Sequence, residues 1–565
     1  MDTVLRRALE RGLPVTAAVV FAAVRLYVVV TTHLLYDDAF ITFRYARNLA
    51  SGAGFVFNSG EKVLGTTTPL FTVILAAFAR IGVPPHVAAP LLNLGFELAT
   101  LWVLYRILTA EGREGDRPRW GWLVFSLAAL LWALDPIGYE VGVAGMEMPL
   151  MVFLLAACYR DMLNGRGGRA GVLAALAILT RIDALPAVGL IYAYLLVARR
   201  REGGVAQALK SALVCGAVLL PCVLLMWAYF GSPIPNSIFA KRYYSTLFTK
   251  EWIKATEDLL RYKVPLLFFE FPFRRLETAL FLWAAVELLV IRKAGREWAG
   301  AAGLLLYPLC YYPAITFSGF ITQRWYLYPG LPFFAVGVAV GAALLWEMIW
   351  ARFAGFAALF FALSFGALAE VSIIQYKAFS FDLAGMVTGP LTNLAVYAGL
   401  LYGAKRMKWP LLAGFVAVFL TAALAVSLGG SLQTMRGYAQ GYEGTNEEIG
   451  KWIARERPGA AVAVGEIGYI GYYSGAKIVD LVGLVQPEVL KIRESSGLVG
   501  VFEHYRPDLL IFETQEGGKP AGSEFAKSEL FQKEYRAAKT WSVTRVGPGG
   551  GVRELTAFER ADSRR

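Results

Sequence analysis

Long apolar stretches separated by short polar segments make up most of this chain. The first, residues 13–32, is long enough to cross a bilayer as a helix, and three arginines precede it. It lacks the small-residue cleavage site of a secretory signal, so we expect a retained first membrane helix. The stretches 84–108 and 120–135 are also long enough to cross. The pattern predicts a polytopic α-helical membrane protein.

Residues 69–82 are apolar but short for a crossing. If they crossed, the arginine-rich loop 106–119 would lie outside the cell, against the rule that such loops stay cytoplasmic. We therefore expect this segment to form an interfacial or re-entrant helix.

Clusters of Lys and Arg alternate with polar segments that have fewer cations, and short loops rich in these residues remain cytoplasmic. This alternation predicts about 13 membrane crossings, with the N-terminus cytoplasmic and the C-terminus extracytoplasmic. The net charge of +12 is then a signal of topology rather than of nucleic-acid binding. Beyond the N-terminus, the clusters lie at 106–119, 166–169, 199–201, 292–296 and 405–408.

Composition supports a membrane protein. Hydrophobic residues make up 57% of the chain and charged residues only 17%, more apolar surface than one soluble core hides. All four cysteines fall within apolar runs, so neither a disulfide framework nor a zinc-finger spacing is present.

The pattern changes after residue 430. Thr445 and Glu448 have the spacing of a capping box ahead of an amphipathic helix that ends near Pro458. Short aliphatic runs at 460–465, 477–483 and 508–513 then predict strands buried in a small α/β sheet. We expect two domains, a membrane domain at 1–429 and an extracytoplasmic α/β domain at 430–565.

The most polar segment between apolar stretches is residues 36–70. It begins with two adjacent carboxylates, Asp37 and Asp38, placed where the first membrane helix meets water. Ionisable groups at that depth are costly and usually functional, although such a pair also suits a solvated helix end. Cations and amides follow, including Arg44 and Asn48, as in a site for an anionic, hydroxyl-rich substrate.

Further polar residues fall in segments predicted to face outward. Glu147 suits either a site carboxylate or a charge at a helix N-terminus. Arg181 and Asp183 are interpreted as a structural ion pair. Lys241 and Arg324 lie where membrane helices meet the outer face, and either a phosphate-binding role or an interfacial snorkelling role suits Lys241. We expect these groups to converge on one extracytoplasmic cavity.

Several segments carry a family resemblance. The block DDAFITFRYARNLASGAGFVFNSGEKVLGTTTPL, followed by GMEMPL, LTRID and PNSIFAK and by an α/β C-terminal region, resembles the GT-C superfamily of polytopic glycosyltransferases. The first block is especially similar to the mycobacterial terminal β-arabinofuranosyltransferases and their bacterial relatives. The resemblance implies an enzyme of the bacterial plasma membrane. It would transfer a hexose or pentose from a polyprenyl-phosphate donor to a hydroxyl of a glycan or glycolipid at the outer face. Arabinose, mannose, glucose and other pentoses remain open as the donor sugar.

The residues suit that chemistry. Glycosyl transfer to a hydroxyl needs a base for the acceptor proton, and a carboxylate supplies one. A phosphate leaving group needs cations rather than a proton. We expect Asp37 to be the base and Asp38 to orient a hydroxyl or bind a metal. The residues expected to bind substrate are Arg44, Asn48, Glu147, Lys241 and Arg324.

No cofactor is required by these residues. Carboxylates at Asp37, Asp38 and Glu147 are compatible with Mg²⁺, Mn²⁺ or Ca²⁺, and mechanisms with and without a metal remain open. The alternative function is a transporter or flippase of polyprenyl-linked glycolipids. Transporters usually carry internal repeats and polar residues at the bilayer midplane, and neither is visible in this sequence.

Overall fold

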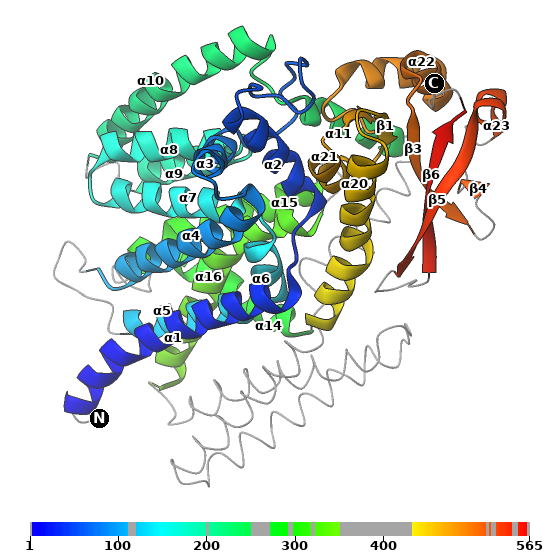
Figure 1. Ribbon diagram of the computed structural model, residues 1–565. Helices are drawn as coiled ribbons and strands as arrows, with labels where there is room; N and C mark the ends of the chain where they lie inside the picture. Colours follow the sequence, from blue (N-terminus) through cyan, green and yellow to red (C-terminus); the bar gives the residue numbers. More distant parts are fainter. Residues whose placement is uncertain are drawn as a thin grey trace. The chain divides into compact units, whose positions relative to one another are not determined.

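The fold is described from a computed structural model (Figure 1). It describes residues 3–110, 120–198, 203–249, 272–291, 298–317, 323–350, 432–515, 519–520, 527–544 and 552–561. The chain divides into two compact units. The first comprises Met1–Tyr27, Leu98–Tyr139 and Trp252–Gln433, and the second comprises Val28–Glu97, Glu140–Glu251 and Thr434–Arg565.

Helix α16 (Leu331–Trp350) is the central element of the first unit. It packs against α5 (Gly121–Leu134), α14 (Pro272–Ala285) and α15 (Ala299–Phe317). Gly337 and Gly341 allow close contact with α14, because a Cβ at these positions would lie 2.3 Å from a ring carbon of Phe281 and 2.1 Å from the Leu280 carbonyl oxygen. This small-xxx-small spacing is typical of membrane helix pairs. The π-helix η3 (Val286–Ile291) extends α14, and the 3₁₀ helix η5 (Arg324–Gly330) precedes α16.

An arginine inside the first membrane helix, α1 (Thr3–Thr32), joins it to α5. Arg25 is fully buried and donates hydrogen bonds to the carbonyl oxygens of Ala133 at 3.0 Å and Trp132 at 3.3 Å. These carbonyls belong to the last turn of α5, where a cation is favoured by the helix dipole. Helix α6 (Pro136–Val143) follows at a bend of 70°.

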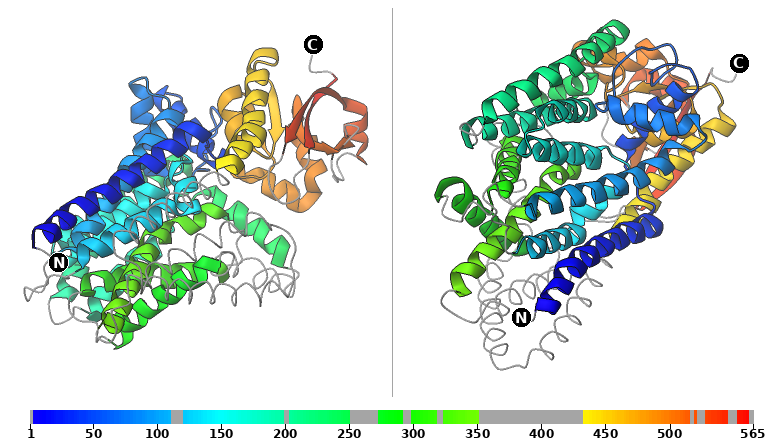
Figure 2. Two further views of the ribbon diagram at one scale, coloured as in Figure 1. Left: turned by 90° about the horizontal axis from the view of Figure 1, so that it is seen from below. Right: turned by 90° about the vertical axis from the view of Figure 1, so that its left-hand side faces the viewer.

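The membrane part of the second unit is a set of helices that pack side by side (Figures 1 and 2). Helix α8 (Gly167–Thr180) lies between α7 (Met148–Leu163) and α10 (Gly204–Phe230), and Gly171 of α8 allows contact with the Ser211 carbonyl of α10. The second unit also contains α2 (Asp37–Ala50), α3 (Pro69–Arg80), α9 (Ala184–Ala198) and α11 (Asn236–Thr249), while α4 (Pro85–Leu108) contributes to both units.

In the described ranges, four helices are long and apolar enough to cross a membrane, or five if α5 and α6 count as one bent span. They are Arg7–Thr32, Pro85–Leu108, Gly204–Phe230 and Trp325–Leu344. The first two coincide with the expected crossings at 13–32 and 84–108. Helix α3 has 12 residues, in keeping with the expectation that 69–82 does not cross. The total of about 13 crossings stays a prediction, and its segment 351–431 lies outside the described residues.

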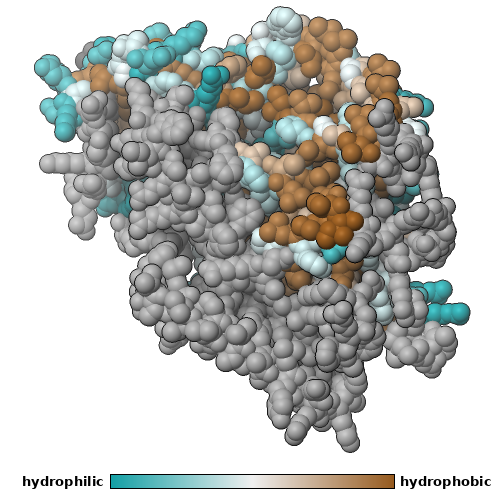
Figure 3. All heavy atoms as spheres, turned by 180° about the vertical axis from the view of Figure 1, so that it is seen from behind, coloured by the Kyte–Doolittle hydropathy of each residue, from teal (hydrophilic) through white to brown (hydrophobic). Residues whose placement is uncertain are grey.

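Exposed apolar side chains are frequent on these helices, as expected where helices face lipid. On α10, Leu213 is 74% exposed and Leu225 is 70% exposed. Hydrophobic residues also cover broad areas of the described surface on the face shown in Figure 3. In water such areas would be costly, so these helices are consistent with a membrane environment.

The C-terminal region, residues 432–561, contains a six-stranded mixed sheet in the order β2-β1-β3-β6-β5, with β4 paired to β3. Strands β1 (Ala461–Val464), β2 (Lys477–Asp480) and β3 (Leu509–Gln515) are parallel and confirm the strands expected at 460–465, 477–483 and 508–513. Strands β4 (Lys519–Pro520), β5 (Tyr535–Thr544) and β6 (Val552–Arg560) are antiparallel additions.

Helices cover both faces of this sheet. On one face, α20 (Gly444–Glu456) and α21 (Ile467–Ser474) form a hydrophobic core that also includes Ile41, Tyr45 and Phe57 from the N-terminal polar block. On the other face, α22 (Pro487–Tyr505) and α23 (Glu529–Glu534) pack against Ala463, Val479 and Leu510. The block at 36–70 is therefore part of the core that supports the sheet.

The predicted capping box at Thr445 is wrong. Residues 432–438 are already helical, and the π-helix η6 (Ala439–Glu443) leads directly into α20. Because Thr445 lies inside a continuous helix, its hydroxyl donates back to the Gly441 carbonyl at 2.6 Å instead of capping a free amide. Glu448 accepts a hydrogen bond from the Trp541 indole at 3.1 Å.

Candidate active site

The first turn of α2 is held by the N-terminus of α21. The Asp37 carboxylate accepts hydrogen bonds from the backbone amides of Gly468 at 2.9 Å and Tyr469 at 2.8 Å. These amides have no partner within their own helix, and the positive end of the helix dipole favours a negative group. Asp37 thus joins two segments that are more than 400 residues apart in the sequence.

Two further carboxylates lie near Asp37. Glu443 accepts a hydrogen bond from the Asp37 amide at 3.3 Å, and Glu466 interacts electrostatically with both acids. Burial, and then the charge of Glu466, raises the pKa of Asp37 well above its usual range. Burial, and then the charge of Asp37, does the same to the pKa of Glu443. This acidic cluster, Asp37 with Glu443 and Glu466, therefore favours retention of a proton.

Asp38 has a different environment from its neighbour. It is half-buried, and within the described part of the chain its carboxylate forms no hydrogen bond or ion pair. The two adjacent carboxylates are thus distinct, since Asp37 is engaged by backbone amides and Asp38 keeps its acceptor capacity.

Arg44 and Asn48, expected to bind substrate, contact the protein itself. The buried Arg44 guanidinium donates to the carbonyl oxygens of Phe57 at 2.8 Å, Gly471 at 2.7 Å and Ala476 at 2.7 Å, and burial lowers its pKa. The Asn48 amide donates to the carbonyls of Val56 and Phe57 at 2.9 and 3.0 Å. These donors hold the loop 51–58 and α21 in place, and a role of Arg44 and Asn48 in substrate binding stays a prediction.

Other polar residues of the sequence motifs also form hydrogen bonds with the backbone of the C-terminal region. The Asn58 side chain accepts from the Ile478 amide at 3.0 Å and donates to its carbonyl at 2.8 Å, so it closes the outer edge of β2 as a neighbouring strand would. The amide of Asn236 donates to the carbonyls of Gly483 and Leu484 at 2.7 and 3.1 Å.

Glu147 precedes the first turn of α7 and is buried. It forms an ion pair with Arg181, which also donates to Asp183 at 2.8 and 2.9 Å. The expected pair between Arg181 and Asp183 is present, and it extends to Glu147. Because a buried arginine and carboxylate neutralise one another, this contact satisfies Glu147 without a substrate.

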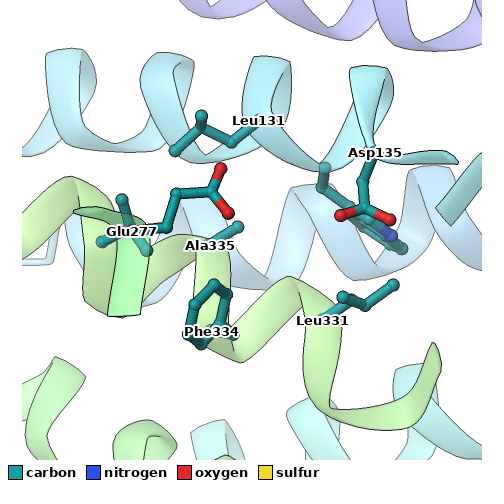
Figure 4. A pocket seen from close by; sticks show the side chains of 8 residues that line it. Leu131, Asp135, Glu277, Leu331, Phe334 and Ala335 are labelled. Carbon is teal, nitrogen blue, oxygen red and sulfur yellow. The ribbon is translucent and has the colours of Figure 1, made fainter. Parts of the chain in front are cut away.

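The two candidate phosphate ligands lie in different units. Lys241 is half-buried on α11 of the second unit, and Arg324 begins η5 in the first. Asp135 also belongs to the first unit, where it lines a small pocket together with Glu277, Leu331 and Phe334 (Figure 4). Convergence of all these groups on one cavity stays a prediction.

The described residues contain no group of three or more His, Cys, Asp or Glu side chains arranged to hold a metal ion. Asp38 as a metal ligand stays a prediction.

Comparison with solved structures identifies the fold. The chain matches ArnT from Cupriavidus metallidurans, in a crystal structure bound to undecaprenyl phosphate, with a TM-score of 0.57 and 13% identity over 97% of this chain and 98% of that one. It also matches the oligosaccharyltransferase of Archaeoglobus fulgidus, with a TM-score of 0.55 and 11% identity over 91% of this chain and 70% of that one. This chain has the GT-C fold. The expected resemblance to the GT-C superfamily is confirmed at this level.

Sequence comparison adds a relative and a family. The chain is 25% identical over 222 residues to the terminal β-(1→2)-arabinofuranosyltransferase of Mycobacterium tuberculosis. That match covers 36% of this chain and spans about a third of the relative's length, 34%. Residues 433–559 match a family described as a domain of unknown function, DUF8728. The alternative of a transporter receives no support from these relatives.

Sequence reasoning missed Glu443 and Glu466. Both lie in the C-terminal region, and no motif joins them to Asp37. The available signal was their position in the sequence. Glu443 lies at the start of the predicted amphipathic helix, and Glu466 directly follows the predicted strand at 460–465.

Proposed function

We propose that this chain is a membrane glycosyltransferase. It moves a sugar from a polyprenyl-phosphate donor to a hydroxyl of a cell-envelope glycan or glycolipid at the outer face of the bacterial plasma membrane. The shared fold with ArnT, which was crystallised with undecaprenyl phosphate, supports the class of donor. The partial match to an arabinofuranosyltransferase supports a pentose, with arabinofuranose as the first candidate.

The observation that carries the proposal is the contrast between the two aspartates. A general base needs a carboxylate with free acceptor capacity within reach of a proton. Both carboxylate oxygens of Asp37 accept hydrogen bonds from backbone amides, whereas the Asp38 carboxylate has no such partner among the described residues. We therefore assign the base to Asp38 and a supporting role to Asp37, which reverses the roles expected from the sequence.

In the proposed reaction, Asp38 takes the proton of the acceptor hydroxyl while the hydroxyl oxygen forms a bond to the anomeric carbon of the donor sugar. The bond between that carbon and the phosphate oxygen breaks, and polyprenyl phosphate leaves with the bonding electrons. The leaving group gains negative charge, which a nearby cation stabilises. Lys241 and Arg324 are our candidates for this task.

The proposed orientation places the N-terminus in the cytoplasm and residues 430–565 outside, as the distribution of cations favours. In a cysteine-free background, Tyr243→Cys on α11 should react with a membrane-impermeant maleimide in intact cells, and Arg169→Cys should react only after lysis. The reverse result would invert this topology.

The donor assay tests the function directly. The purified full chain would be incubated with polyprenyl-phosphate-linked arabinofuranose, mannose and glucose, together with envelope glycan acceptors, and release of polyprenyl phosphate measured. We expect turnover with one donor class. Absence of turnover with every donor, while polyprenyl phosphate moves across vesicles that contain the protein, would favour the transporter.

A further inference from the structure

Glu443, in the C-terminal region, contacts the proposed active site. It is 1% exposed and ends the π-helical turn η6, and its Oε1 atom accepts a hydrogen bond from the Asp37 amide. That amide lies in the first turn of α2, where backbone N–H groups have no partner within the helix. The residue after it is Asp38.

The Glu443 side chain is unusual for a purely structural residue. Its Oε2 atom is buried and has no well-aligned hydrogen bond to a described residue. The Tyr438 side chain lies beside the carboxylate. A buried polar atom without a partner costs roughly 1–3 kcal/mol. A π-helical turn within an α-helix is also rare and is frequent at functional sites. Stability alone therefore does not explain a carboxylate at this position.

The C-terminal region holds the first turn of α2 from a second side as well. Gly468 comes so close that a Cβ there would lie 1.9 Å from the Asp37 carbonyl oxygen and 2.7 Å from its carboxyl carbon. The amide of Asp37 is thus bound by Glu443, and its carbonyl and carboxyl groups lie against the N-terminus of α21.

We propose that Glu443 is a positioning residue for the transfer reaction: it fixes the first turn of α2 and thereby the direction of the Asp38 carboxylate. The C-terminal region then completes the active site and is not an independent appendage. This inference rests on the proposed function, because it assumes that Asp38 acts on substrate.

Substitution of Glu443 tests this role with a conservative rescue. Glu443→Ala removes the acceptor for the Asp37 amide, and kcat should fall roughly a hundredfold, the effect of a misplacement of about 1 Å at a reacting group. The KM for the donor should stay within about threefold, because Glu443 does not touch the substrate. Glu443→Gln keeps the Oε1 acceptor and should retain most of the activity. Glu447→Ala, a change at an exposed ion pair with Lys451 on the same helix, is the matched control and should match wild type.

Hydrogen exchange separates positioning from a general loss of structure. In Glu443→Ala, amides 37–41 should exchange at least tenfold faster, while β1 and β3 stay protected, and Glu443→Gln should restore the wild-type rates. Unchanged kcat in Glu443→Ala, or a rise in KM alone, would overturn the proposal. Loss of protection throughout the sheet without rescue by glutamine would also overturn it. If the wild type transferred no sugar, the proposed function would fail, and the exchange rates would still decide whether Glu443 orders this turn.

Discussion

The backbone amide of Gly468 donates a hydrogen bond of 2.9 Å to the carboxylate of Asp37. Together with the bond from Tyr469, it ties the first turn of α2 to the first turn of α21. A buried backbone amide that loses its acceptor costs about 1–3 kcal/mol, so both of these hydrogen bonds contribute to stability. This contact sets the distance between α2 and α21.

Gly468→Ala should separate these helices. The added Cβ would lie 1.9 Å from the Asp37 carbonyl oxygen, which no backbone tolerates without a shift. We expect a loss of about 1–3 kcal/mol in stability, the usual cost of overpacking, and a fall in transfer activity of at least tenfold. Thermal unfolding in detergent and the donor assay would measure both. Gly465→Ala, where a Cβ meets nothing within 4 Å, is the control and should behave as wild type. Equal stability and activity of the two variants would show that Gly468 does not pack this closely against Asp37.

A second prediction concerns the buried ion pair between Glu147 and Arg181. Arg181→Met leaves a buried carboxylate without its partner and should cost about 3–5 kcal/mol, measured by thermal unfolding. Adding Glu147→Gln should recover much of that loss, because the unpaired charge is removed.

The double variant also tests the substrate-binding role that the sequence predicted for Glu147. If Glu147 is structural, recovered stability should bring recovered transfer activity. A stable double variant that lacks activity would instead show that Glu147 acts on the substrate.

The third prediction concerns the leaving phosphate. Arg324→Ala and Lys241→Ala should each weaken binding of polyprenyl phosphate by at least tenfold, because each change removes a cation proposed to pair with the phosphate. Binding would be followed by the change in melting temperature on addition of the lipid. Arg564→Ala, in the C-terminal tail, is the control. Normal binding in both site variants would place the phosphate elsewhere.

Much of the architecture follows from the sequence because its signals are local. A bilayer-length apolar run marks α1 and α4, and short aliphatic runs mark β1, β2 and β3. Strands β5 and β6 escaped prediction because they form a hairpin at one edge of the sheet whose polar residues, such as Lys539 and Thr540, interrupt the apolar signal.

The site was harder to predict, because arginine and amide side chains bind phosphates and backbone carbonyls equally well. Arg44 has the residue type of a phosphate ligand, but its partners Gly471 and Ala476 are more than 400 residues away. No spacing in the sequence shows such a contact. For the same reason the sequence could not show that the Asp37 carboxylate accepts hydrogen bonds from α21 while the Asp38 carboxylate does not.

The most direct test of the account is transfer of a labelled sugar from a polyprenyl-phosphate donor by the wild-type chain and by Asp38→Asn. The variant should keep the wild-type melting temperature and lose at least a hundredfold in kcat, as expected when a general base is removed. Asp37→Asn should instead lose stability, because an amide offers a single acceptor oxygen to the two backbone N–H groups. Wild-type transfer by Asp38→Asn would contradict the central claim that Asp38 is the base of a membrane glycosyltransferase.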